Sequence, residues 1–220
     1  MITLYGFGES GNAYKVALML ALTQTPWRLE FVPFFSGGTR TPEFRAINEM
    51  GEVPVLVDGD VTLSQSGVIL DYLVQKTGLF GGRTEADRGG ADRGEPDRRE
   101  ILRWVLWDNH KFSAQIGTAR FLMNFIPEDK RPAGAIPFVQ GRLKGACAVL
   151  EKHLEDRQWL ACDGPTTADL SCCSYLYYPE PWGFDLADYP AIARGLDRIR
   201  ALPGWQHPYD LMPRAFPPAP

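Results

Sequence analysis

The stretch at residues 48–73, NEMGEVPVLVDGDVTLSQSGVILDYL, decides the fold. Residues 55–57 and 61–63 are rich in β-forming side chains, and the Asp-Gly-Asp sequence between them predicts the turn of a β-hairpin. Ser66 then introduces apolar residues at helical spacing, which predict a helix that ends near Gly78. The stretch therefore predicts two paired strands followed by a helix.

The residues before this stretch alternate between strand and helix patterns. Residues 2–5 and 28–33 are rich in β-formers, and the apolar residues at 13–20 recur at helical spacing. Thr41 followed by Pro42 is typical of a helix start. The whole order is β-α-β-α-β-β-α, which predicts an α/β domain with a mixed sheet covered by helices.

A charged, Gly-rich segment follows the first eighty residues. Residues 81–97 contain no large apolar side chain, so we expect a linker between a first domain at 1–80 and an all-helical domain at 98–220. Helical patterns recur in this second domain, at 101–125, 139–154, 166–177 and 191–202. Thr166-Thr167-Ala168-Asp169 is predicted to form a capping box.

Composition and charge exclude several classes of protein. The 220 residues are 45% hydrophobic and 23% charged, as in ordinary globular proteins, and the net charge of −4 argues against nucleic acid as a partner. The longest apolar run, at residues 16–22, is too short to cross a membrane, and no secretory signal is visible, so we expect a cytoplasmic protein. The four cysteines form no C-x-x-C pair and the three histidines are dispersed, so no metal site is expected.

The first candidate for chemistry lies at the junction of the first strand and the first helix, Gly8-Glu9-Ser10-Gly11-Asn12. A helix N-terminus offers free N–H groups and a partial positive charge, so Ser10 and Asn12 could donate hydrogen bonds to an anion there. Both residue types are also favoured helix caps, and capping alone explains this pattern as well.

Two further candidates lie within the stretch at 48–73. Pro54 stands at a strand start, where a cis peptide bond would leave the backbone of Val53 free to pair with an extended peptide ligand. Gln65 and Ser66 stand at a helix start, where a carboxylate could bind. The alternatives are a turn proline and a simple cap.

A fourth candidate is a cluster in the helical part that contains Trp104, Trp107, Asp108, His110 and Lys111. The two tryptophans are three residues apart, a spacing found more often in a core than in a ligand pocket. No partner for His110 can be identified from the sequence.

Each signal is weak by itself, but their order along the chain resembles the cytosolic glutathione transferases. The resemblance covers nearly the whole chain and is strongest at residues 48–56 and 63–73, while the capping box at 166–169 matches one in the helical domain of that family. It implies a thioredoxin-like N-terminal domain, an all-helical C-terminal domain and a homodimer. It also implies glutathione as a co-substrate, without a metal.

The resemblance assigns roles to the candidates that bind the tripeptide. Val53 looks like the residue whose backbone pairs with the cysteinyl unit of glutathione, beside a cis Pro54. Gln65 and Ser66 look like the residues that hold the γ-glutamyl group.

The resemblance also suggests which side chains activate the thiol. Ser10 stands where serine-type classes have their catalytic serine, and Asn12 resembles the asparagine of the bacterial Nu class. Both remain candidates for the main thiolate donor. Tyr5 is weaker, because it lies inside the first strand.

One position departs from the pattern of the family. Many relatives have Gln or Lys where this chain has Glu52, whose carboxylate would repel the glycyl carboxylate of glutathione if it pointed inward. Its backbone could act instead, or Arg40 could supply the missing positive charge.

The resemblance implies a transferase that activates the glutathione thiolate for attack on a small hydrophobic electrophile. A free thiol has a pKa of about 8.5, so a few hydrogen bonds to the sulfur are needed to ionise it near neutral pH. The electrophile is expected in a cleft lined partly by the helix at 101–125, with Trp104, Trp107 and His110 as wall residues. The alternatives are a glutathione-dependent disulfide-bond reductase and a non-catalytic binding or scaffold protein, which Glu52 favours.

Overall fold

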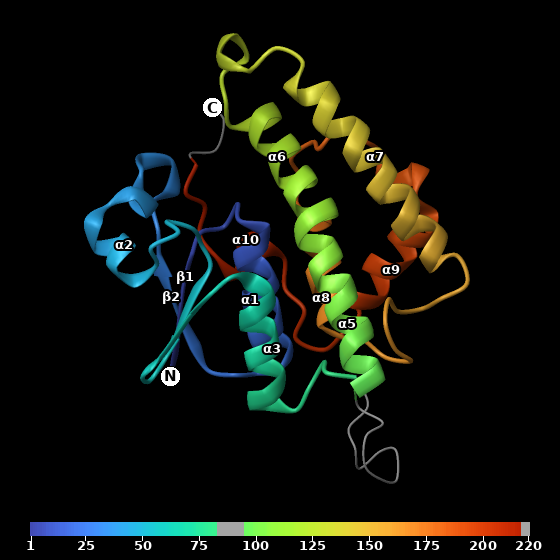
Figure 1. Cartoon of the computed structure of the whole chain (residues 1–220), viewed down its shortest axis with the longest axis horizontal. Helices are drawn as coiled ribbons and strands as arrows, with labels where there is room; N and C mark the ends of the chain where they lie inside the picture. The colour runs from blue at the N-terminus through green and yellow to red at the C-terminus, as the bar shows by residue number, and fades with distance from the viewer. Residues whose placement is uncertain (83–94, 217–220) are drawn as a thin grey trace. The chain divides into compact units, whose positions relative to one another are not determined.

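The protein is described by a computed structural model that covers residues 1–82 and 95–216. Its internal contacts divide the chain into two units, Met1–Gly78 with Leu202–Pro220, and Leu79–Ala201 (Figure 1).

The first unit is built on a four-stranded mixed sheet. Its strands are β1 (Ile2–Gly6), β2 (Trp27–Phe31), β3 (Val55–Asp58) and β4 (Val61–Ser64), in the order β2-β1-β3-β4. β1 runs parallel to β2 and antiparallel to β3, and β3 and β4 form the predicted hairpin. The expected mixed sheet is confirmed.

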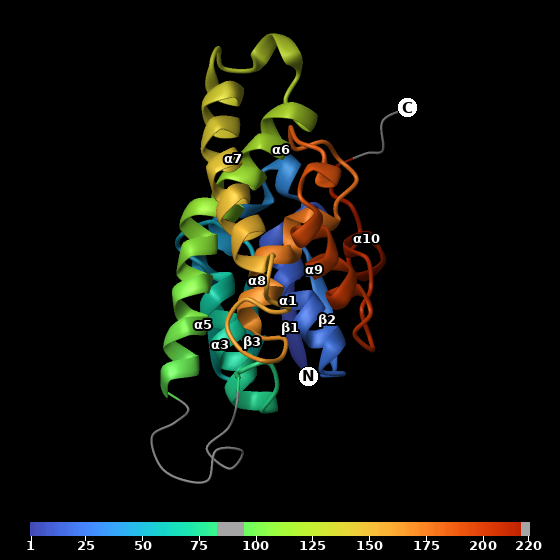
Figure 2. The ribbon, with the colours of Figure 1, turned by 90° about the vertical axis from the view of Figure 1, so that its right-hand side faces the viewer.

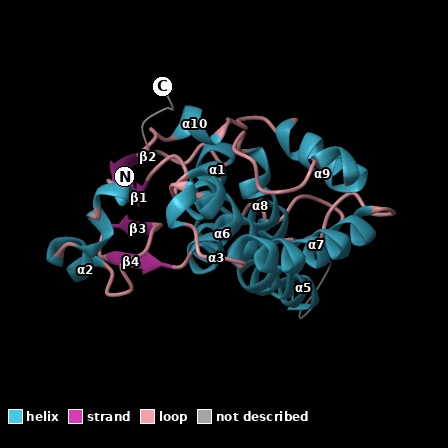
Figure 3. Ribbon diagram, turned by 90° about the horizontal axis from the view of Figure 1, so that it is seen from above, coloured by secondary structure: helices cyan, strands magenta, loops and turns pink. Residues whose placement is uncertain are grey.

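Three helices cover the two faces of this sheet. α1 (Gly11–Leu22) and α3 (Ser66–Thr77) lie on one face, and the short α2 (Pro42–Ile47) lies on the other (Figure 3). Leu4 and Leu56, which are partners in the β1–β3 register, have no exposed surface. Burial of such apolar side chains drives the assembly of the layers.

The hairpin is also joined to α3 by a polar cluster. The Tyr72 hydroxyl and the Lys76 ammonium both donate to Asp58 Oδ2, each at 2.7 Å. The hydrogen bond from Lys76, with that from Tyr72, lowers the pKa of the Asp58 carboxyl. This cluster fixes α3 against the sheet.

The end of the chain does not belong to the helical domain in which the sequence places it. α9 ends at Arg200, and Leu202–Pro220 groups with the first unit, including the short helix α10 (Pro208–Leu211). The Gly8 N–H donates to Pro213 O at 2.7 Å, and the Tyr14 hydroxyl donates to Gln206 O at 2.8 Å. These contacts join residues about 200 positions apart, so no local pattern could predict them.

The second unit contains helices alone among its described residues. They are α5 (Glu95–Trp107), α6 (Ser113–Asn124), α7 (Ala135–Leu154), α8 (Thr167–Cys173) and α9 (Pro190–Arg200). A π-helical turn, Asp108–Phe112, joins α5 to α6 without a break, so the helix expected at 101–125 is continuous and contains one wider turn. α8 lies between α5 and α9 (Figure 2). Most of the predicted linker, at 83–94, lies outside the described residues, and residues 95–97 are helical.

The capping box at the start of α8 is confirmed. The Thr166 hydroxyl accepts from the Ala168 N–H, and Asp169 Oδ2 accepts from the Thr166 N–H at 2.8 Å. Asp169 Oδ1 accepts from the Leu160 N–H at 2.9 Å, which joins the preceding loop to the helix. Burial raises the pKa of the Asp169 carboxyl to about 6 in spite of these hydrogen bonds.

All four cysteines are thiols rather than members of disulfide bonds, and Cys147, Cys172 and Cys173 are buried. Burial raises the pKa of the Cys147 thiol to about 12. Within residues 1–82 and 95–216, no helix is both long and apolar enough to cross a membrane, and no three His, Cys, Asp or Glu side chains are placed to hold a metal ion.

Candidate functional site

Ser10 is the residue that begins α1. Its backbone is extended, with φ −81° and ψ 104°, and its Oγ accepts a hydrogen bond from the Ala13 N–H at 3.2 Å. The predicted capping role is therefore present. Capping uses the oxygen as an acceptor, which leaves the hydroxyl proton available to donate to an anion at the helix N-terminus. Capping and anion binding are thus compatible at Ser10.

Asn12 and Ser66 meet where two helices begin. The Ser66 Oγ lies 3.5 Å from Asn12 Oδ1, which brings the first turn of α3 to the first turn of α1. Asn12 is half-buried and Ser66 is 5% exposed. The N–H dipoles of two helices favour negative charge in this region, so an anion placed there gains from both.

The Val53–Pro54 peptide bond is cis, as expected from the sequence. The turn before it is held by Asn48, whose Nδ2 donates to Glu52 O at 2.8 Å and whose Oδ1 accepts from the Met50 N–H at 3.2 Å. Asn48 is 6% exposed, and the sequence analysis assigns it no role. An Asn side chain that accepts from the backbone N–H two residues later forms an Asx turn, so Asn48 is a recognisable local signal for this turn. The turn presents Val53, which is half-buried, two residues before β3 begins at Val55.

Gln65 and Glu52 lie against each other. The Gln65 Nε2 donates to Glu52 Oε2 and to Met50 Sδ, each at 3.2 Å. Gln65 has φ +68°, a conformation that costs energy for a residue with a side chain and that is typical of functional sites. Because the amide nitrogen bonds Glu52, the amide oxygen of Gln65 is left to accept from a ligand.

Two further candidates, Arg40 and Tyr5, have no recorded hydrogen bond to Ser10, Asn12 or Ser66 in the part of the chain that the structure describes. Arg40 is exposed at the end of a 3-10 turn, Gly38–Arg40, and the structure records no ion pair for it among the described residues. Tyr5 lies within β1, and its ring packs edge-on against Phe44 of α2, 6.3 Å between centroids. Tyr5 therefore contributes to the core under α2.

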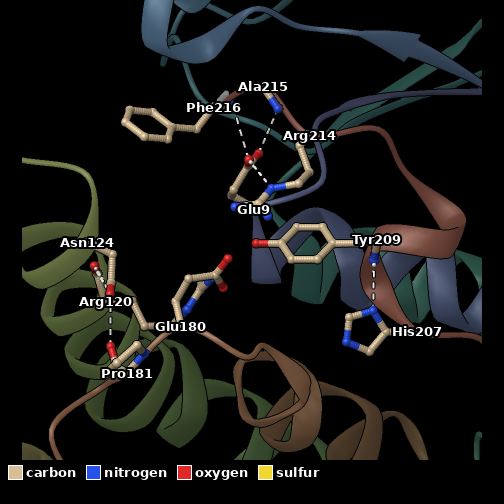
Figure 4. A network of polar contacts seen from close by, with 10 residues as sticks. All are labelled: Glu9, Arg120, Asn124, Glu180, Pro181, His207, Tyr209, Arg214, Ala215 and Phe216. Carbon is tan, nitrogen blue, oxygen red and sulfur yellow. Dashed lines mark hydrogen bonds and ion pairs between the residues drawn. The ribbon is translucent and has the colours of Figure 1, made fainter. Parts of the chain in front are cut away.

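Glu9 is a site residue that sequence reasoning missed. It immediately precedes Ser10, and its carboxylate accepts from the Ala215 N–H at 2.9 Å and the Phe216 N–H at 3.0 Å (Figure 4). Arg214 Nε lies 3.4 Å from the same carboxylate. The one local signal for Glu9 is its place in the Gly-rich loop directly before α1. Its partners lie near residue 215, so no local pattern includes them.

The structure does not bring Trp104, Trp107 and His110 into one pocket. Trp104 is 3% exposed, and its ring packs against His153, 4.5 Å between ring centroids. Trp107 lines a hollow of about 300 Å³ on the helical unit, together with Lys111, Arg142, Gly145, Ala146 and Val149. His110 is exposed. Trp104 therefore acts as a core residue.

A second polar cluster lies within the helical unit. Arg120, which is 1% exposed, donates to Glu180 at 2.7 Å (Figure 4). Its guanidinium lies 4.0 Å from the centre of the Tyr178 ring. Asn124 Nδ2 donates to Pro181 O at 2.8 Å. This cluster holds the loop before α9 against α6.

Comparison with known families gives matches in both parts of the chain. Residues 1–75 match the family described as "Glutathione S-transferase, N-terminal domain", and residues 116–203 match "Glutathione S-transferase, C-terminal domain".

Individual relatives match over nearly the whole chain. The chain is 29% identical to the disulfide-bond oxidoreductase YfcG of Escherichia coli, over 92% of each chain. It is 30% identical to the glutathione S-transferase-like protein tpcF of Aspergillus fumigatus, over 93% of each chain.

Solved structures share the fold. A possible glutathione S-transferase from Rhodopseudomonas palustris has a TM-score of 0.83 and 31% identity, covering 94% of this chain and 97% of that one. A glutathione transferase from Burkholderia graminis, described with two glutathione molecules bound per subunit, has a TM-score of 0.76 and 25% identity, covering 92% and 85%.

Proposed function

Because the chain belongs to the glutathione S-transferase family, we propose that it binds glutathione and stabilises the glutathione thiolate for attack on a small hydrophobic electrophile. The observation that carries the proposal is the meeting of two helix N-termini at Asn12 and Ser66, beside Ser10. This arrangement gathers N–H dipoles, a hydroxyl and an amide around one point, which is what a thiolate requires.

The tripeptide would be held by groups that the first unit leaves available. The backbone of Val53 pairs with the cysteinyl unit beside the cis Pro54, and the Gln65 amide oxygen and the Ser66 N-terminus hold the γ-glutamyl group. Arg40 is exposed and near neutral pH carries the positive charge that the glycyl carboxylate needs. Glu52 acts through Gln65, whose amide it orients.

The chemical step follows from the acidity of the thiol. Ser10 and Asn12 donate hydrogen bonds to the sulfur, the thiol proton is lost to water, and the thiolate attacks the electrophilic atom while its leaving group departs. Each unit by which the thiol pKa falls requires about 1.4 kcal/mol of preferential stabilisation of the thiolate. Two hydrogen bonds to a charged group supply an amount of this size.

A second reaction is favoured by a specific comparison. The match to the disulfide-bond oxidoreductase YfcG covers 92% of this chain, and Asn12 resembles the asparagine of the bacterial Nu class. In this reaction the bound thiolate attacks one sulfur of a disulfide and releases the other as a thiolate. The thiolate of a second glutathione then attacks the glutathione sulfur of the mixed disulfide. This step forms oxidised glutathione and releases the remaining substrate sulfur as a thiolate. The family also supports a homodimer, which sedimentation of the purified protein would test.

Three measurements test the proposal. Retention on immobilised glutathione tests binding, and turnover of an aryl halide and of a small disulfide tests the two reactions against each other. Faster turnover of the halide supports the transferase, and faster turnover of the disulfide supports the reductase. Retention without turnover of either substrate would favour the non-catalytic alternative. Absence of both retention and turnover would refute the proposal.

A further inference from the structure

The carboxylate of Glu9 is buried one residue before Ser10, with 1% of its side chain exposed. A buried carboxylate is costly unless hydrogen bonds replace its water. Those bonds come from the backbone N–H groups of Ala215 and Phe216, at 2.9 and 3.0 Å, and from the Arg214 guanidinium at 3.4 Å (Figure 4). Glu9 therefore fixes the loop before α1 to the last described residues of the chain.

Gly8 lets the loop before α1 approach the segment at 212–216 closely. Its N–H donates to Pro213 O at 2.7 Å, and a Cβ added at Gly8 would lie 2.8 Å from Pro213 O and 2.9 Å from Met212 O. These are backbone atoms, so a side chain at position 8 would force the two segments apart. Two consecutive residues of the loop are thus bonded to the segment at 212–216.

The segment at 212–216 is itself anchored to the first unit. Met212 is 1% exposed, and the Phe216 ring packs edge-on against Phe35, 5.0 Å between centroids. The Arg214 guanidinium lies 4.5 Å from the centre of the Tyr209 ring in α10. The segment can therefore resist movement of the loop that it holds.

We propose that Glu9 is a positioning residue for thiolate activation, and that the C-terminal segment 212–216 is the support through which it acts. This inference rests on the proposed function, since it concerns where the Ser10 hydroxyl points. Ser10 follows Glu9 directly and begins α1, so a loop released from the segment at 212–216 changes the direction of the hydroxyl and of the first N–H groups of the helix. A small displacement of such a donor weakens its hydrogen bond to the thiolate and therefore lowers the stabilisation of that charge.

Two pairs of variants separate positioning from folding. Glu9→Ala removes the carboxylate, whereas Glu9→Gln keeps one acceptor oxygen. Because the Ala215 N–H bonds Oε2 and the Phe216 N–H bonds Oε1, the glutamine can accept from one of these two groups in the observed geometry. Ala215→Pro removes one of these N–H groups without changing Glu9, whereas Ala215→Gly keeps it. Because Ala215 lies near the chain end, the second pair tests the inference even if Glu9→Ala does not fold.

The readouts are the pH dependence of the ultraviolet absorbance of bound glutathione thiolate, the glutathione Kd and kcat. We expect Glu9→Ala and Ala215→Pro to lower the fraction of bound thiolate near neutral pH about tenfold, with Kd changed less than about threefold. Ala215→Gly should keep most of the wild-type thiolate fraction, and Glu9→Gln, which keeps one of the two acceptor oxygens, should retain more of it than Glu9→Ala. An unchanged pH profile in folded Glu9→Ala, or in Ala215→Pro, overturns the inference.

The proposed function fails separately from this inference. If the wild-type protein binds no glutathione, or forms no thiolate near neutral pH, the proposed function is wrong. If the wild type forms the thiolate and Ser10→Ala loses it while Glu9→Ala and Ala215→Pro do not, only the positioning role is wrong.

Discussion

The Ser66 hydroxyl lies 3.5 Å from the amide oxygen of Asn12, so the first turns of α3 and α1 are in direct polar contact. Asn12 stands in the part of the chain expected to bind sulfur, and Ser66 in the part expected to bind the γ-glutamyl group. In the proposed function, the contact therefore couples binding of the γ-glutamyl end of the tripeptide to the placement of a thiolate donor at its central cysteinyl unit.

The coupling predicts a non-additive pair of substitutions. Asn12→Ala should lower kcat/KM about tenfold or more by removing a hydrogen bond to charged sulfur, and Ser66→Ala should raise the glutathione Kd by a similar factor. For the free energy calculated from kcat/KM, the change in the double variant should differ from the sum of the changes in the two single variants by more than about 0.5 kcal/mol, because contacting residues rarely act independently. Kinetics and calorimetry on the four proteins measure this, and strict additivity would show that the two residues act separately.

Ser10 allows the capping role to be separated from chemistry. Ser10→Ala should destabilise the fold by about 1 kcal/mol, whereas Ser10→Gly should cost only a few tenths, because glycine is tolerated as an N-cap. Both lack the hydroxyl, so both should lower kcat/KM about tenfold or more. Ser36→Ala, at an exposed position of the same unit, serves as the control. Near wild-type activity in Ser10→Gly would make Ser10 a cap and nothing more.

The charge of Glu52 is predicted to have little effect on binding. Glu52 is exposed and its carboxylate accepts from Gln65, so Glu52→Gln keeps the acceptor and removes only a screened charge. We expect the glutathione Kd to change less than about threefold. Titration calorimetry at low and high salt measures it. Binding that becomes tenfold tighter in the variant, most clearly at low salt, would mean that Glu52 opposes the ligand.

Local patterns predict most of the first unit because its determinants are local. The Asp-Gly-Asp turn at 58–60, the cap at Ser10 and the cis Pro54 each depend on a few adjacent residues. The bonds of Glu9 depend on residues more than 200 positions away in a Pro-rich segment without periodicity. No spacing rule reaches that far, so both this contact and the true place of residues 202–216 escape prediction.

The tryptophans show a different limit. Spacing of three residues places Trp104 and Trp107 on adjacent positions of one helix but does not tell which faces the core. In the structure Trp104 donates to Glu100 and packs on His153, whereas Trp107 reaches a surface hollow. Which of two neighbouring apolar residues is buried depends on the helices packed against them, and this information is not local.

The proposed chemistry uses the thiol of glutathione and none of the protein's own. Cys147 is buried and its thiol pKa is raised to about 12 by burial, so it should react slowly with alkylating reagents, while half-exposed Cys162 should react first. Treatment with iodoacetamide, followed by removal of the reagent before glutathione is added, should leave activity above about half. Mass spectrometry identifies the modified cysteine. Complete loss of activity on modification of Cys162 alone would require a role for that thiol.

Asp169 predicts how the stability of the fold depends on pH. Its carboxyl has a pKa of about 6 in the folded protein, raised by burial from 3.8. The folded state therefore binds more protons than the unfolded state between these values. The resulting stabilisation is fully present below about pH 4 and is lost as the pH rises through about 6.

The matched variant is Asp169→Asn, which keeps the shape and cannot titrate. The free energy of unfolding of the wild type minus that of Asp169→Asn should fall by about 2 kcal/mol between pH 4 and pH 7, and most of the fall should lie between pH 4 and pH 6. Denaturant titrations of both proteins across this range measure the difference, and contributions from other groups cancel in it. A difference that stays constant, or that rises with pH, would mean that the hydrogen bonds from Leu160 and Thr166 outweigh burial and keep the carboxylate ionised.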